Sequence, residues 1–324
     1  MSLHRFNENF FLLIILLLFF MGFLNPKFLK IPQSSYNHKV IQNNLSNVTI
    51  NIDRLNQYYS NNNYLSSDQF ENKNVVFEWS KIILNYVKND VPIPRMYFPY
   101  IPKNISQYET KEKKSVFKAI LLPIALRGNE IVLEERKLMK IAFSTNNIYQ
   151  IELLSKKYKI KNFKSINFSN LNKSELRLIK SELMNKINSI PISLILAQSI
   201  IESGWGASRF AQEGNALFGQ WTWKNNDGIK PKGNLFANFS VKNFDSLLDS
   251  VNSYILNLNT HQAYKGLRSF RLSQYNMGKN ITGNDMANFL DKYAEIGVEY
   301  VIKVKKMIEI NKLSKYENSI LTKF

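Results

Sequence analysis

The sequence predicts a mainly helical α+β protein with a small β-lobe, preceded by an N-terminal membrane helix. Three observations support this fold class. Residues 10–24 form an uncharged apolar run, several later segments repeat apolar residues at helical spacing, and two short aromatic-rich runs flank a turn region. Apolar residues at helical spacing indicate helices that bury one face. Two short aromatic-rich runs around turn residues are typical of a β-hairpin.

Composition excludes several kinds of site. The 324-residue chain has no cysteine, and its three histidines, His4, His38 and His261, are scattered. Disulfides and cysteine nucleophiles are therefore excluded, and a multi-histidine metal site is not expected. The formal charge of +18 attracts polyanions but equally fits a composition rich in Lys, Asn and Ile. We expect no metal, no cofactor and no nucleic-acid partner.

The apolar run Phe10–Leu24 predicts a membrane segment. It is slightly shorter than the ~20 residues that span a bilayer, and both a cleaved signal peptide and an uncleaved anchor fit it. The following residues, 25–28, offer no small-x-small cleavage site, which favours an anchor over residues 1–30. Residues 31–75, rich in Asn, Ser, Gln and Tyr, are predicted to be a flexible stalk.

Helical periodicity dominates the rest of the chain. Residues 76–170 are predicted to be a helical region without recognisable chemistry. A further helix begins at Asn172 and has Glu175 three residues later, which is the spacing of a capping box. The strands are expected within 217–223 and 235–241. Helices are expected at Val75–Val87, Lys113–Met139 with a bend near Pro123, Tyr149–Tyr158, Asn172–Ile187, Pro191–Ser203, Asp245–Leu258, Asn284–Tyr293 and Ile296–Ile310.

The helix that begins at Pro191 is apolar on nearly every side, which predicts burial in the middle of a domain. Its last turn carries Glu202, followed by Ser203-Gly204-Trp205-Gly206. A carboxylate at the negative end of a helix, beside buried isoleucines and a tryptophan, is disfavoured in its charged form. A raised pKa would let Glu202 act as a general acid near neutral pH. A surface glutamate that closes a helix is the alternative.

Ordered motifs surround this glutamate. Those at Ala197–Gly206, Ser208–Phe210 and Asn215–Gly219 resemble the signature of bacterial glucosaminidases, the family 73 glycoside hydrolases. Further motifs at Leu122–Glu130, Phe244–Ser246, Ser253–His261 and Ala263-Tyr264 resemble the Bax-type, membrane-associated branch of that family. The resemblance covers roughly residues 90–312.

This resemblance implies a lysozyme-like catalytic domain over residues 171–312, followed by a tail at 313–324. A glycan would lie between its helical lobe and its β-lobe. Glu202 matches the family's catalytic acid and Tyr293 a tyrosine that lines the site, whereas Tyr300 is expected to serve packing. Phe218 could either contact sugar or fill the core of the β-lobe. The residues predicted to bind substrate are Trp205, Asn215, Phe218, Gln220, Trp221 and Trp223.

The second catalytic group is not evident. Inverting hydrolysis needs a second carboxylate to activate water. Ser240 stands where related sequences carry a glutamate, and Asp227 in the turn is the nearest acid. Asp227 could take the role, or the substrate's N-acetyl group could act as an internal nucleophile assisted by Tyr293, or the enzyme could be weak.

The predicted function is hydrolysis of peptidoglycan glycan strands by an endo-β-N-acetylglucosaminidase at the inner membrane, with its catalytic domain facing the periplasm or wall. A lytic transglycosylase is one alternative, since that class also uses one glutamate. Its usual Gly-Leu-Met-Gln motif is replaced here by Ala216-Leu217-Phe218-Gly219-Gln220. A catalytically silent wall-binding protein is another.

Overall fold

A computed structural model of the chain describes residues 72–222, 228–230 and 240–323. These residues belong to one compact unit, Ile50–Phe324. The expected membrane anchor and nearly all of the expected stalk lie outside them, as do Trp223 and Asp227. Within the described ranges, no helix has the length and apolar character needed to cross a membrane.

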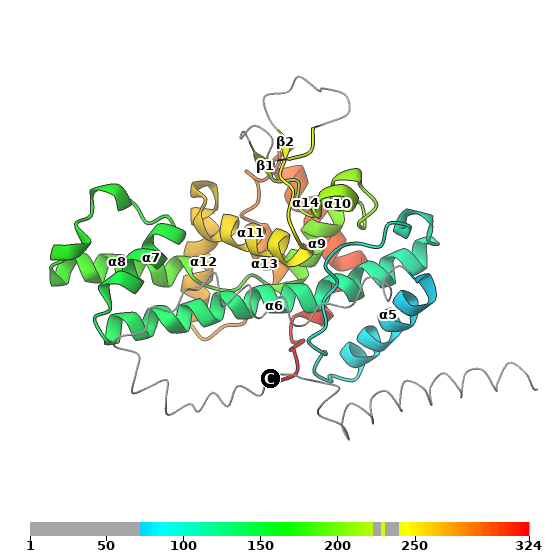
Figure 1. Cartoon of the computed structure of the whole chain (residues 1–324), viewed down its shortest axis with the longest axis horizontal. Coiled ribbons are helices and arrows are strands. Elements are labelled where there is room, and N and C mark those ends of the chain that lie inside the picture. The colour runs from blue at the N-terminus through cyan, green and yellow to red at the C-terminus, as the bar shows by residue number, and fades with distance from the viewer. Residues whose placement is uncertain (1–71, 223–227, 231–239, 324) are drawn as a thin grey trace, which may run out of the picture. The chain divides into compact units, whose positions relative to one another are not determined.

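The described part of the chain is mainly helical, with one small sheet (Figure 1). Four short 3₁₀ turns precede or connect helices at Ile105–Gln107, Phe163–Ser165, Phe168–Asn170 and Gln262–Tyr264, and a fifth, η5, spans Leu313–Tyr316. The α-helices are α5 (Lys73–Lys88), α6 (Thr110–Ser144), α7 (Ile148–Lys157), α8 (Lys173–Lys186), α9 (Ile192–Ser203), α10 (Arg209–Gly214), α11 (Leu247–Thr260), α12 (Lys265–Asn276), α13 (Gly283–Ala287) and α14 (Val298–Ile310).

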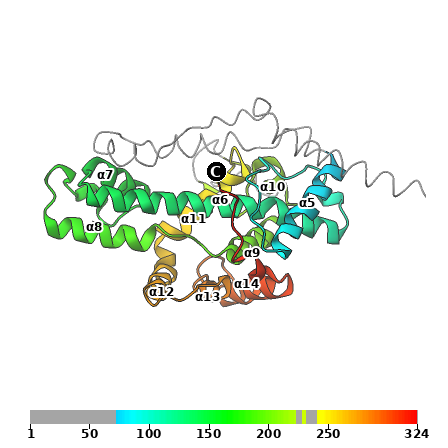
Figure 2. The ribbon, with the colours of Figure 1, turned by 90° about the horizontal axis from the view of Figure 1, so that it is seen from below.

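Helix α6 is the longest element of the described residues, and α5, α7, α9 and α11 all pack against it (Figures 1 and 2). The helix passes through Pro123, where a bend was expected, as one continuous element of 35 residues. The capping box predicted for α8 is confirmed, because Asn172 and Glu175 each bond the other's backbone N–H.

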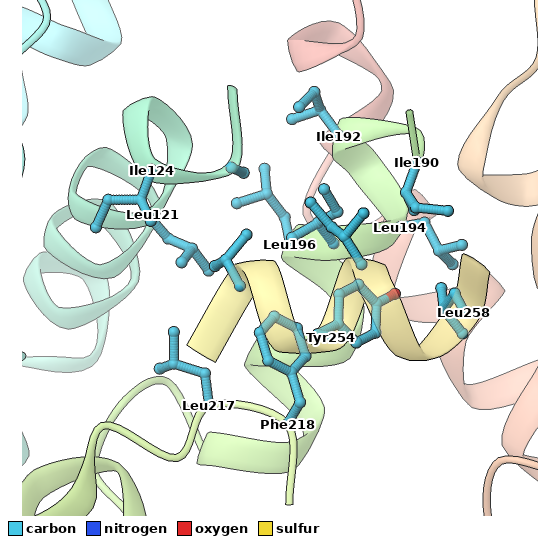
Figure 3. Packing of buried hydrophobic residues seen from close by; sticks show 14 of the residues in the cluster. Leu121, Ile124, Ile190, Ile192, Leu194, Leu196, Leu217, Phe218, Tyr254 and Leu258 are labelled. Atoms are coloured by element: carbon cyan, nitrogen blue, oxygen red, sulfur yellow. The ribbon is translucent and has the colours of Figure 1, made fainter. Parts of the chain in front are cut away.

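Helix α9 lies at the centre of the core, as its all-round apolar pattern predicts. It packs against α6, α13 and α14. Leu194 and Leu196 are fully buried, and Figure 3 shows them between residues of α6 and the Tyr254 side of α11. Burying one such side chain contributes roughly 1.5–3 kcal/mol. The helix that carries Glu202 is thus fixed by packing along its length.

Polar side chains from distant helices fix the turn that leads into α9. Asn129 of α6 exchanges two hydrogen bonds with the backbone of Ile190, at 2.7 and 2.9 Å. The buried guanidinium of Arg271 donates to the carbonyls of Asn188 and Ser189 at 3.1 and 3.0 Å. These bonds satisfy backbone groups that the turn would otherwise leave buried without partners.

The C-terminal residues, which we expected to form a tail, pack into the same body. Leu313 and Tyr316 are fully buried. The backbone N–H of Ile93 donates to Ile320 at 2.8 Å, and that of Thr322 donates to Ile93 at 2.8 Å. A parallel bridge therefore joins this segment to the chain that precedes α6.

Glu317, in the same C-terminal segment, bonds the N-terminus of α9. Its Oε2 accepts from the N–H of Ile192 at 2.9 Å, and its Oε1 accepts from the Ser193 hydroxyl. The same Oε1 accepts from the N–H of Gly283 at the start of α13, at 3.1 Å. A carboxylate is favourable there because helix N-termini present unpaired N–H groups and positive potential.

The β-lobe is smaller than expected among the described residues. Strands β1 (Trp221–Thr222) and β2 (Ser240–Val241) pair antiparallel, with Trp221 opposite Val241. Residues 217–220 are not strand, because Leu217 and Phe218 turn inward and pack in the core.

The helix expected at 284–293 is only partly present. It ends at Ala287, and Tyr293 is carried on the turns that follow. Asn288 and Asp291 favour such turns. Helix α12 was not among the expected elements.

Candidate active site

Glu202 stands in the last turn of α9. The helix ends directly after it because Gly204 and Trp205 adopt left-handed backbone conformations, with φ of 58° and 61°. Glycine takes this conformation at no steric cost and commonly follows a helix. The Glu202 side chain is half-buried, so it is neither a solvated surface group nor a sealed core residue.

Burial raises the pKa of the Glu202 carboxyl above its ordinary value, in the direction that the sequence predicted. A hydrogen bond from Tyr300 and the positive charge of Lys303 act in the opposite direction but do not cancel the effect of burial. The acid therefore keeps its proton to higher pH than a solvated glutamate.

A chain of hydrogen bonds orients this acid. The Tyr254 hydroxyl donates to Gln198 Oε1 at 2.5 Å, and Gln198 Nε2 donates to the Tyr300 hydroxyl at 3.1 Å. Tyr300 in turn donates to Glu202 Oε1 at 2.6 Å. Each group in this series donates to the next one, and the last of these bonds orients the Glu202 carboxyl through Oε1.

The other carboxylate oxygen of Glu202, Oε2, faces Gly219. A Cβ atom at Gly219 would lie 3.4 Å from Oε2, and the residue has φ of +59°. Because Oε1 already accepts from Tyr300, Oε2 is the oxygen that can carry the acidic proton. Gly219 keeps the space beside it open.

Tyr293 also belongs to this tyrosine cluster. Its ring stacks on that of Tyr300, with centroids 5.2 Å apart and an interplanar angle of 10°. Its hydroxyl donates to the backbone carbonyl of Phe218 at 3.1 Å. Burial raises the pKa of Tyr293 well above its ordinary value, so the group is a neutral hydrogen-bond donor.

Tyr300 was expected to serve packing, and the structure corrects this interpretation. The ring is buried, but its hydroxyl is the direct partner of Glu202. Burial and the neighbouring carboxylate raise the pKa of Tyr300, which therefore remains a donor. Gln198 and Tyr254 were likewise missed, although Gln198 lies four residues before Glu202 and hence on the same helix face.

The predicted substrate-binding residues have different environments. Phe218 is 2% exposed and stacks on Tyr254 with centroids 4.0 Å apart, so its ring lies in the core (Figure 3). Trp221 on β1 is 53% exposed. Asn215 takes a left-handed conformation after α10 and donates to the carbonyl of Phe244 at 3.0 Å. Gln220 donates weakly to the carbonyl of Ser253, at 3.3 Å.

Trp205 extends to the side of α9 that faces α6 and α14. Its ring meets Phe117 edge-on, with centroids 6.1 Å apart, and Lys114 Nζ lies 5.2 Å above it. Trp205 therefore packs against α6 and is not part of the tyrosine cluster that contacts Glu202.

The described residues contain no group of three His, Asp or Glu side chains placed to hold a metal ion. In those same ranges, no carboxylate is among the groups that shift the pKa of Glu202. Ser240 is buried in the sheet opposite Thr222. Asp227, the candidate second acid, lies outside the described residues.

The site thus has a half-buried glutamate at the end of a buried helix, oriented by a tyrosine hydroxyl and close to a small sheet. This arrangement is suited to glycosidic cleavage. Comparison with known proteins identifies the class. Residues 179–313 match the glucosaminidase family, described as mannosyl-glycoprotein endo-beta-N-acetylglucosaminidase. The chain therefore carries a glucosaminidase-family domain, which implies a glycoside hydrolase, and the family predicted from the sequence motifs is confirmed.

One curated relative is protein bax of Escherichia coli (strain K12). The two chains are 27% identical over 196 residues, which cover 58% of this chain and 66% of the relative. The matched part thus falls just short of two thirds of the relative's length. The chain is a distant homologue of that protein. No solved structure gives a significant match.

Proposed function

We propose that this protein is a peptidoglycan hydrolase that cleaves the glycan strand as an endo-β-N-acetylglucosaminidase, with Glu202 as the general acid. The observation that carries the proposal is the state of the Glu202 carboxyl. Burial raises its pKa, Tyr300 holds Oε1, and Oε2 is left to deliver a proton. A glycosidic leaving oxygen needs such a proton donor.

The proposed reaction begins with transfer of the proton from Glu202 Oε2 to the glycosidic oxygen, as the bond from that oxygen to C1 breaks. The carbonyl oxygen of the substrate's 2-acetamido group then bonds to C1 and forms an oxazolinium ion. Water attacks C1, reopens this ring and gives a proton back to Glu202 Oε2. One water is consumed, a reducing N-acetylglucosamine end is released, and the acid is restored.

Substrate assistance is favoured because it requires no second protein carboxylate. Tyr293 is the residue we assign to orient the acetamido group: its proton is donated to the Phe218 carbonyl, and its hydroxyl oxygen accepts from the acetamido N–H. Asp227 as a water-activating base is the competing assignment. An Asp227→Asn variant that keeps its activity supports substrate assistance, and a variant that loses hydrolysis by two orders of magnitude or more supports the inverting mechanism.

We further propose that the enzyme acts at the outer face of the cytoplasmic membrane, anchored by the apolar run Phe10–Leu24. Exposed aromatic groups near the small sheet would provide stacking surfaces for sugar rings. Trp221, with 53% of its surface exposed, is the described example.

The test is digestion of purified peptidoglycan with the full-length chain, followed by mass spectrometry of the new ends. Reducing N-acetylglucosamine ends, absent with Glu202→Gln, are the expected result. Anhydro-muramyl ends would instead identify a lytic transglycosylase, which also works with one acid. Retained binding without any product would identify a catalytically silent wall-binding protein. Both of the latter outcomes overturn the proposed hydrolysis.

A further inference from the structure

A pocket of about 220 Å³ is lined by residues of α6, of α14 and of the turn that follows α9. We call it the lysine pocket, because Lys114 of α6 and Lys303 and Lys306 of α14 line it. Its apolar wall is formed by Trp205, Met307 and Ile310. A pocket of this size can admit a short side chain with its charged end.

The lysines of this pocket have no carboxylate partner among the described residues. The ion pairs formed among the described residues involve other lysines and arginines, and no acidic side chain lines the pocket. Lys114 is placed over the Trp205 ring. Three ammonium groups therefore share a concave surface, and none of them forms an ion pair with a carboxylate of the described residues.

Further positive charge lies next to the pocket. Lys118 follows Lys114 by one helical turn of α6 and is half-buried. Burial lowers its pKa, and the charges of Lys315 and Lys114 lower it further. This mutual repulsion is a cost that a bound anion would relieve.

The lysine pocket and the acid are parts of one surface. Trp205 follows Glu202 by three residues, in the turn that ends α9, and α14 lies beside α9 (Figure 2). The charge of Lys303 acts directly on the Glu202 carboxyl. Under the proposed function, a group bound in the pocket would therefore lie near the glycan whose bond is cut.

From this geometry we propose that the lysine pocket binds the carboxylates of the peptide stems attached to the glycan strand. The stems combine free carboxylates with alanine methyl groups, which match the ammonium groups and the Trp205–Met307–Ile310 wall. The proposal rests on the proposed function, because it assigns a subsite to that same substrate. It makes the enzyme selective for stem-bearing strands over stripped ones.

The cleavage test compares stem-bearing strands with strands stripped of stems by an amidase, using the full-length chain. The variant is Lys114→Gln/Lys306→Gln, because Lys303 also acts on the acid and would confound the result. We expect KM for stem-bearing strands to rise about three- to tenfold with kcat unchanged, and stripped strands to be unaffected. The matched control, Lys140→Gln/Lys305→Gln, makes the same charge change on the same helices outside the pocket and should change neither substrate.

A binding test separates this proposal from the proposed function. Glu202→Gln protein is titrated with a soluble muramyl tetrapeptide and, separately, with vesicles of anionic phospholipid. Peptide binding that weakens about three- to tenfold in the Lys114→Gln/Lys306→Gln background supports the stem subsite even if no glycan is hydrolysed. The proposal is overturned if hydrolysis occurs but the Lys114→Gln/Lys306→Gln variant keeps the wild-type KM for stem-bearing strands, if the peptide does not bind, or if only vesicle binding depends on these lysines.

Discussion

The two ends of helix α9 each meet a glutamate, and the two glutamates have opposite relations to the helix. At the N-terminus, Glu317 accepts hydrogen bonds from the N–H of Ile192 and the hydroxyl of Ser193. At the C-terminus, Glu202 is part of the helix, is half-buried, and accepts from Tyr300 at 2.6 Å. The N-terminal carboxylate matches the positive end of the helix, whereas the C-terminal one faces its negative end.

Under the proposed function, this difference separates stability from activity on a single element. Glu317 satisfies backbone donors and stabilises the fold. Glu202 is held where its charged form is disfavoured, and in the proposed reaction this keeps a proton available for transfer. The site therefore depends on a helix that is stabilised well enough at one end to tolerate an unfavourable group at the other.

The largest effect is expected from removing the acid. Glu202→Gln should lower kcat by about 10²–10⁴-fold, because the proton donor is lost while the shape is kept. Since the folded pKa of Glu202 is raised, its ionisation costs stability above the unfolded pKa. The variant should therefore be slightly more stable to urea at neutral pH, and this gain should vanish below the unfolded pKa. A Glu202→Gln enzyme with full activity would refute the assignment, and Glu299→Gln is the matched control.

Removing the opposite glutamate should affect stability instead. Glu317→Ala should lower the free energy of unfolding by about 2–4 kcal/mol, because it leaves several donors at the starts of α9 and α13 without partners. Urea denaturation measures this. Glu309→Ala, an exposed site near the end of α14, should change it by less than about 0.5 kcal/mol. Equal free energies of unfolding for the two variants would show that Glu317 does not stabilise the start of α9.

Loss of the Tyr300 hydroxyl should weaken the acid's orientation and raise its pKa further. Tyr300→Phe removes the hydrogen bond that favours the ionised carboxylate. The alkaline limb of the kcat profile should move to higher pH, and kcat at the optimum should fall by roughly tenfold. Tyr316→Phe is the control, since that buried hydroxyl has no hydrogen-bond partner among the described residues. A shift of the limb to lower pH would contradict the mechanism.

The smallest effect is expected from Lys303, whose positive charge also lowers the pKa of Glu202 but less than the Tyr300 bond does. Lys303→Gln should move the alkaline limb to higher pH by less than Tyr300→Phe, with kcat at the optimum nearly unchanged. Added salt should also move the alkaline limb of the wild-type enzyme to higher pH, because salt screens the charge of Lys303. The limb of the Lys303→Gln variant should move less. An identical salt response in both enzymes would show that Lys303 does not act on the acid.

The sequence predicted the elements whose signals are local. The spacing of Asn172 and Glu175 identified a capping box, and the apolar circumference of α9 identified a buried helix ending at an unusual acid. The ordered motifs around Glu202 identified the glucosaminidase family, which the comparison of residues 179–313 confirms.

What the sequence did not predict depends on contacts between distant residues. Tyr300 meets Glu202 across 98 positions, and Tyr254 meets Gln198 across 56. No periodicity encodes such a pair, because a buried tyrosine has the same pattern whether or not its hydroxyl has a partner. Phe218 illustrates the converse, since an aromatic residue in a site motif proved to be core.

The bridge between Ile93 and residues 320–322 bears on how the domain folds. The Arg95 side chain bonds the Thr322 carbonyl across 227 positions, and Ile192 bonds Glu317 across 125. Contacts this far apart form only after much of the chain has been ordered, which makes folding slow and cooperative. Residues 179–313 alone would lack α6, Glu317 and this bridge. The region that defines the family therefore lacks contacts that hold both ends of α9, and we expect residues 179–313 alone to be less stable than the full compact unit.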